Sequence, residues 1–262
     1  MGNADKLSDK LRVSSIATMA KAKTVDHRER AEALRKEGVE EIAPATSLYR
    51  RTLNHATIMQ LFQNHITALD TAESRMAPRD FCRYLALKAL LPNASDPARK
   101  QFRSLFTNYY GLNAGGLRDE FKDRFFKILF DGKVIVKGQP DYPTILNELS
   151  IIPRTKGDCA MPFSFVSKLV AIHYEASPIY DRHVLNFFKR KAPTAATPKD
   201  ERIKWYVDFL NEVATDYTAW AKDMRVTPIL GRFKARDQRL AQCNNIRLID
   251  FLVWKVGNQK LL

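Results

Sequence analysis

The sequence predicts an all-α protein, a globular fold built from many helices. Nearly every long segment of the 262-residue chain repeats apolar side chains at spacings of three and four, the period of a helix that buries one face. Prolines near positions 78, 92, 97 and 143 mark starts and ends of these segments, as helix boundaries require. A single short segment, residues 133–137, has the composition and the flanking glycines of a strand.

The N-terminal half predicts five helices in order. Residues 26–38 are rich in Glu, Arg and Ala and end on glycine, which predicts a charged, solvated helix. Residues 56–69 carry one apolar stripe, and residues 78–91 begin with proline and stop before the next one. Residues 96–110 and 117–130 each place a row of phenylalanines and leucines on one face.

The C-terminal half follows the strand candidate with more helices, joined by two irregular connections at residues 152–162 and 189–199. The helices are expected at residues 142–149, 163–174, 181–190, 200–223, 228–242 and 246–256. A weakly marked boundary near residue 140 would divide the chain into an N-terminal helical region, 1–140, and a C-terminal helical region, 141–262. A single domain is the alternative.

The chain is strongly basic. Its formal net charge is +14, and more than half of this excess lies in residues 151–262. Such an excess is typical of proteins that bind a polyanion, most often nucleic acid, although some basic proteins bind nothing in particular. Hydrophobic residues at 45% and charged residues at 27% are ordinary for a globular protein and exclude a disordered chain.

Several classes of protein lack sequence support. The three cysteines are far apart with no histidine at ligand spacing, which argues against a disulfide scaffold or structural zinc and fits a reducing cytosol. No nucleotide-binding glycine motif, zinc-protease motif or acidic metal cluster is present, so no cofactor or metal is expected. Without a long apolar stretch or a secretory signal, we expect no membrane partner and a cytoplasmic location, on the nucleoid in a bacterium or in the nucleus of a eukaryote.

One lysine and one aspartate are the strongest candidates for chemistry. Lys168 lies within the apolar stretch 162–172, where desolvation lowers the pKa of an amine and makes it a better nucleophile. Asp181 follows a proline-containing turn at the expected start of a helix, where its carboxylate can act as the N-cap. A lysine that extends to solvent and an aspartate that only caps a helix are the alternative interpretation.

The segment 145–184 resembles the helix-hairpin-helix DNA glycosylases, in particular the 8-oxoguanine glycosylase branch. The matching elements are the helix Ile145–Leu149, the hairpin Ile152–Met161, Lys168 on the next helix, and the turn Pro178–Val184 that contains Asp181. The hairpin has one glycine, Gly157, where the family carries several, and the interval from the lysine to the aspartate is shorter than usual in the family.

The resemblance implies a helix-hairpin-helix element followed by a catalytic aspartate turn, in a DNA glycosylase with possible AP-lyase activity. Lys168 would be the nucleophile that forms a Schiff base, and Asp181 would stabilise positive charge on the sugar of a flipped nucleotide in duplex DNA. Candidates for stacking on the base, each of which could instead belong to the core, are Phe163, Phe165, Tyr174 and Tyr180. Candidates for phosphate contacts, which could instead be solvated surface, are Arg154, Lys156, Arg182 and His183.

Two further interpretations remain open. A non-catalytic helical protein could bind nucleic acid through the basic surface alone. The pair Arg50 and His55 has the spacing found in HEPN ribonucleases. Two other features favour structure over function, because Arg247 and Asp250 are spaced as an ion pair on one helix and the three tryptophans are expected in the core.

Overall fold

The computed structural model describes residues 55–259 except residues 94, 114, 115, 133, 137 and 160. The described residues belong to one compact unit. The predicted helix 26–38 lies outside them, and so does Arg50, the first residue of the ribonuclease pattern. Within the described residues no helix is both long enough and apolar enough to cross a bilayer.

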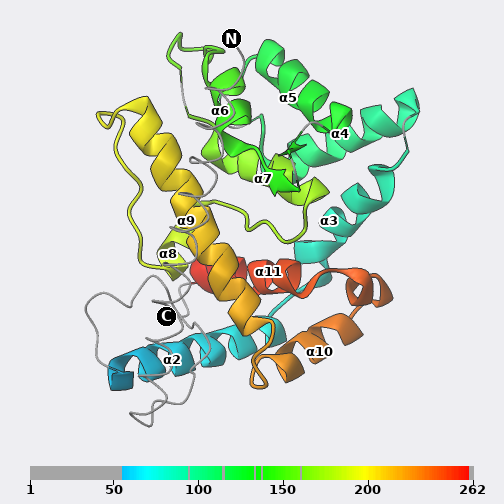
Figure 1. The fold of residues 1–262 in the computed structure, drawn as a ribbon. Helices are drawn as coiled ribbons and strands as arrows, with labels where there is room; N and C mark the ends of the chain where they lie inside the picture. The colour runs from blue at the N-terminus through cyan, green and yellow to red at the C-terminus, as the bar shows by residue number, and fades with distance from the viewer. Residues whose placement is uncertain are drawn as a thin grey trace, which may run out of the picture. The chain divides into compact units, whose positions relative to one another are not determined.

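The described part of the chain is all-α, as the sequence predicts (Figure 1). It contains ten α-helices, one 3₁₀ helix and one pair of two-residue strands. In order, the elements are α2 (His55–Ser74), α3 (Pro78–Leu90), α4 (Asp96–Tyr110), α5 (Asp119–Asp131), β1 (Ile135–Val136), β2 (Gln139–Pro140), α6 (Tyr142–Ser150), α7 (Phe163–His173), α8 (Arg182–Phe187), α9 (Lys199–Trp220), α10 (Thr227–Ala235), η1 (Gln238–Gln242) and α11 (Asn245–Gln259).

Several helix ends follow from local chemistry. α3 and α6 each have a proline in their first turn, where the missing amide hydrogen costs nothing. α5 ends at Gly132, whose φ of +66° is the left-handed conformation that glycine adopts without strain. α5 and α6, on either side of the suggested boundary near residue 140, contact each other.

Two local predictions need correction. The segment 228–242, predicted as one helix, is divided into α10 and η1. The break coincides with Arg236, whose guanidinium donates to the carbonyl oxygens of Glu73 and Met76 at 2.7 and 2.8 Å, and with the extended N-cap Asp237. The predicted strand is shorter than expected and pairs with an unpredicted second strand, in the antiparallel register Ile135 to Pro140.

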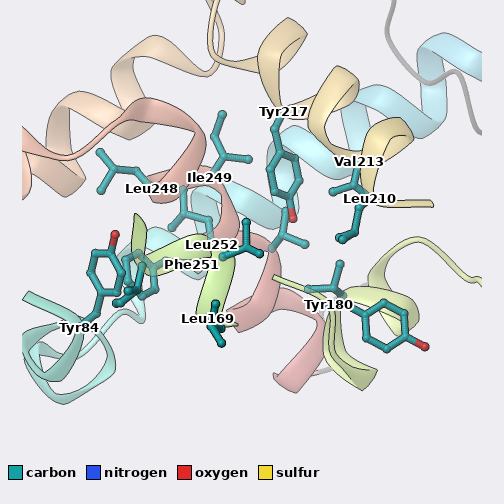
Figure 2. Packing of buried hydrophobic residues seen from close by; sticks show 14 of the residues in the cluster. Tyr84, Leu169, Tyr180, Leu210, Val213, Tyr217, Leu248, Ile249, Phe251 and Leu252 are labelled. Carbon is teal, nitrogen blue, oxygen red and sulfur yellow. The ribbon is translucent and has the colours of Figure 1, made fainter. Parts of the chain in front are cut away.

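The helix α11 is the centre of the core, because it contacts α2, α8, α9 and α10. Leu248, Ile249 and Leu252 are completely buried, and burial of each such side chain contributes about 1.5–3 kcal/mol. Figure 2 shows these residues between Tyr84 of α3 and the α9 side chains Leu210, Val213 and Tyr217.

The contact between α8 and α11 is unusually close. A Cβ atom at Gly257 would clash with the backbone carbonyl of His183. Only glycine leaves room for the backbone of one helix to approach the other in this way. The position of α8, and therefore of the aspartate at its start, depends on this glycine.

Candidate active site

Lys168 extends from α7 into partly desolvated surroundings. Its Nζ donates a hydrogen bond to Ser164 Oγ at 2.9 Å and lies 5.3 and 5.6 Å from the ring centres of Tyr110 and Phe165. Burial lowers the pKa of Lys168, and the negative charge of Asp181 opposes part of this shift. The amine is therefore more readily neutral than that of an exposed lysine.

Asp181 is the N-cap of α8, as the sequence predicts. Its Oδ1 accepts hydrogen bonds from the backbone amides of His183 and Val184 at 2.8 and 3.0 Å. These two bonds fix the orientation of the carboxylate without engaging a side chain of opposite charge.

A serine joins the two candidate residues through their neighbours. Ser167 Oγ accepts a hydrogen bond from the backbone amide of Tyr180 at 2.9 Å. Ser167 is the residue before Lys168, and Tyr180 is the residue before Asp181. This hydrogen bond therefore joins α7 to the start of α8 next to both candidate residues. This bond holds the backbone of Lys168 close to the backbone of Asp181.

A buried ion pair on α11 holds the turn that leads to Asp181. Arg247 donates to Asp250 Oδ2 at 2.6 Å, as the sequence spacing predicts, and also to the carbonyl of Ser177 at 2.6 Å. Asp250 Oδ1 accepts from the amide of Ile179 at 3.0 Å. Burial raises the pKa of Asp250 to about 6, and the positive charge of Arg247 opposes this rise. The backbone groups of this turn are buried away from water, and the ion pair supplies their hydrogen-bond partners.

Lys168 and Asp181 line the same cavity, which we call the Lys168 cavity. Its volume is about 270 Å³, near the lower end of the range of about 300–1,000 Å³ found for small-molecule sites. Its lining comes from α3, α4, α7, the start of α8 and α11, with the residues Arg79, Asp80, Arg83, Tyr109, Tyr110, Lys168, Ile179, Asp181, Val184, Asp250, Phe251 and Trp254.

The segment before α8 contributes side chains alternately to the cavity and to the core. Ile179 and Asp181 line the Lys168 cavity. Tyr180 lies between them in sequence, is 8% exposed, and packs edge-on against Tyr206 and Phe209. The backbone at Asp181 is extended, and side chains that follow one another along extended backbone point to opposite sides, in agreement with the alternation.

The four aromatic residues predicted to stack on a base are not among the residues that line the Lys168 cavity. Phe163 and Tyr180 pack on Tyr206, with ring centres at 4.5 and 5.1 Å. Tyr174 lines a separate cavity beside Pro178. Phe165 lies next to Lys168 and packs edge-on against Phe121, with ring centres 6.4 Å apart.

Other aromatic side chains line the Lys168 cavity instead. They are Tyr109, Tyr110, Phe251 and Trp254. Trp254 is only partly buried, so the expectation that it belongs to the core is wrong; Trp205 is partly buried against the core, and Trp220 is buried as expected. No local pattern distinguishes these four from core residues, because the helices that carry them are far from Lys168 in sequence.

The predicted phosphate-binding residues are likewise outside the lining of the Lys168 cavity. Arg154 pairs with Asp158 across the hairpin, and its Nε donates to Asp158 Oδ1 at 3.1 Å. Lys156 and Arg182 are exposed. His183 is partly buried, with its ring 5.6 Å from that of Trp254.

The basic residues that do line the cavity beside Lys168 are Arg79 and Arg83 on α3, which the sequence reasoning missed. Both are exposed and four residues apart, so they lie on neighbouring turns of one helix face. Their spacing was visible in the sequence, but nothing local connects it with a lysine on α7.

No group of three or more histidine, cysteine or acidic side chains that could hold a metal ion occurs among the described residues. The comparisons with known proteins add no relative: no protein-family model, no curated protein and no solved structure matches the chain.

Proposed function

We propose that this protein is a DNA glycosylase with AP-lyase activity, in which Lys168 attacks the sugar of an extruded nucleotide. The observation that carries the proposal is that Lys168 and Asp181 line one cavity. The sequence spacing only suggested that these two residues act together. Because both line one cavity, a substrate bound there could contact both.

The state of the amine supports a nucleophilic role. A lysine attacks only as the neutral amine, and burial lowers the pKa of Lys168. Its only hydrogen bond to a side chain in the described residues goes to the neutral Ser164 hydroxyl. No described carboxylate accepts a hydrogen bond from Nζ, so no ion pair among the described residues holds the amine in its protonated form.

The proposed reaction begins with attack of Lys168 Nζ on C1′ while the bond from C1′ to the base breaks. The electron pair of that bond leaves with the base, which takes up a proton, and the attacking amine loses one. The sugar ring then opens as the bond between C1′ and O4′ breaks and O4′ takes up a proton, which gives a Schiff base between Nζ and C1′. Loss of a proton from C2′ forms the double bond between C2′ and C3′, and the phosphate leaves with the electron pair of the bond between C3′ and its oxygen. Asp181 would stabilise the positive charge on the sugar, a task suited to a carboxylate already oriented by two amides.

The aromatic side chains of the Lys168 cavity would hold the extruded base. Base-modifying enzymes that act on duplexes take the nucleotide out of the stack and hold it against aromatic or apolar surfaces. In this proposal the base stacks on Tyr109, Tyr110, Phe251 and Trp254, and not on Phe163, Phe165, Tyr174 and Tyr180.

Borohydride trapping tests the proposal directly. Duplexes that carry an oxidised, deaminated or abasic site are incubated with the protein, and the Schiff base is reduced to a stable covalent adduct. We expect an adduct with the wild-type protein and none with Lys168→Gln. Lys204→Gln is the matched control, since Lys204 is exposed on α9 and its loss changes the net charge equally.

A trapped adduct that persists in Lys168→Gln would overturn the assignment of the nucleophile. Binding of DNA without an adduct on any of the substrates would favour the non-catalytic nucleic-acid-binding alternative.

A further inference from the structure

We propose that Arg79 and Arg83 form a clamp for the phosphates of the DNA strand whose nucleotide enters the Lys168 cavity. The nucleic-acid identity of the ligand rests on the proposed function. The clamp itself rests on where the structure puts these two guanidinium groups.

Both arginines combine exposure with access to the cavity. They line the Lys168 cavity and are also exposed, so they connect its interior with solvent. Four residues on an α-helix correspond to a rise of about 6 Å. When a nucleotide is extruded, its base enters the cavity and its phosphates stay outside. Two arginines at the edge of the cavity are placed to bind those phosphates.

The charge of both groups is available to a ligand. Neither arginine forms an ion pair with any carboxylate in the part of the chain that the structure describes. The aspartate between them, Asp80, is engaged by Lys255 Nζ at 2.7 Å and by the backbone amide of Ala77 at 3.0 Å. The planar guanidinium donates two parallel hydrogen bonds to a phosphate, a geometry that lysine cannot reproduce.

The same Asp80 contacts fix the clamp relative to the catalytic candidates. Lys255 belongs to α11, and α11 also carries the Arg247–Asp250 pair that holds the turn before Asp181. The beginning of α3 and the beginning of α8 are therefore attached to one helix. A phosphate held by α3 would lie at a defined position relative to Lys168 and Asp181.

The hairpin is less suited to hold a phosphate. Its backbone amides at Arg154, Thr155 and Gly157 already donate to carbonyl oxygens of the protein, at 2.8, 2.9 and 2.9 Å. The Arg154 side chain is paired with Asp158. A phosphate there would have to displace contacts that the protein makes by itself, whereas none of the described carboxylates competes at Arg79 and Arg83.

The salt dependence of binding tests the clamp. The probe is a fluorescent duplex with one stable abasic-site analogue, and the dissociation constant is measured over a salt series in the Lys168→Gln background, where no covalent step occurs. Each lost phosphate contact reduces the slope of log K against log salt by about 0.9. We expect Arg79→Ala/Arg83→Ala to lower the slope by about 2, and the control Arg154→Ala to leave it unchanged.

Three outcomes overturn the clamp: an unchanged slope in the double variant, an equal loss in Arg154→Ala, or a loss confined to a free 5′-mononucleotide tested as a second ligand. With Lys168 present, the double variant should raise the enzyme concentration needed for half-maximal trapping, whereas the control Lys204→Gln should leave it unchanged. Failure of wild-type trapping would remove the glycosylase proposal without changing the slopes, so the two failures are distinguishable.

Discussion

The two sides of the segment Ile179–Asp181 differ in what their contacts can do. On one side the ring of Tyr180 packs against the rings of Phe163, Tyr206 and Phe209. On the other side Asp181 faces a cavity in which its carboxylate and the Lys168 amine are held by hydrogen bonds yet remain accessible. Of these two neighbouring residues, Tyr180 thus contributes to the stability of the core and Asp181 to the candidate site.

The comparison shows why residue type is a weak guide to a base pocket. Tyr180 and Trp254 are both large aromatic residues with a polar atom, yet Tyr180 belongs to the core and Trp254 lines the cavity. The difference comes from backbone direction and from which helices pack on each side. Substitutions on each side of this segment, and in the ion pair that supports it, test this division.

The largest effect is expected from Arg247→Met, because the Arg247–Asp250 pair supports both sides of the segment. The substitution leaves Asp250 buried without its partner and removes the donor to Ser177. We expect the free energy of unfolding to fall by about 3–5 kcal/mol, measured by chemical denaturation. The double variant Arg247→Met/Asp250→Leu should recover at least half of this loss, and a single-variant loss below about 1 kcal/mol would contradict the role of the pair.

The second effect separates the cavity side from the core side. Asp181→Asn removes the negative charge but keeps an oxygen that accepts from the two amides, so the helix cap is preserved. We expect the single-turnover trapping rate to fall by about 10²–10³-fold, while the melting temperature changes by no more than about 2 °C.

Tyr180→Phe is the matched control on the core side. The ring contacts with Phe163 and Tyr206 remain, so the trapping rate should stay within about twofold and stability within about 1 kcal/mol of the wild type. A large loss of trapping in a stably folded Tyr180→Phe protein would place this tyrosine in the substrate site and break the division.

The smallest effect is a shift in the pH profile of trapping. Since only the neutral amine attacks, the rate should rise about tenfold per pH unit and reach a plateau above the lowered pKa of Lys168, below the usual value of about 10.4. The negative charge of Asp181 raises this pKa, so its removal in Asp181→Asn should move the plateau to lower pH. A shift to higher pH, or a profile without dependence on pH, would contradict the proposed coupling.

Local sequence patterns predicted much of the helical framework. The start of α3, the end of α4, the cap at Asp181 and the ion pair of Arg247 with Asp250 depend on residues within about four positions of each other, so they are visible in a single sequence. The break between α10 and η1 was not predicted, because Arg236 donates to carbonyl groups that are far away in sequence. They belong to Glu73 in α2 and to Met76, just after α2. The residues predicted to stack on the base and to bind phosphate are close to Lys168 in sequence. The residues that line the Lys168 cavity come mostly from helices that are far from Lys168 in sequence.

By itself the sequence determined that the described chain would be helical, that Lys168 would lie in an apolar segment and that Asp181 would begin a helix. These properties depend on the periodicity of side chains along one element and on hydrogen bonds within one turn. Only the tertiary structure decided that Lys168 and Asp181 share a cavity with Arg79, Tyr109 and Trp254. A cavity is the space left where several helices fail to fill the volume between them, and that depends on how α3, α4, α7 and α11 pack rather than on the sequence of any one of them.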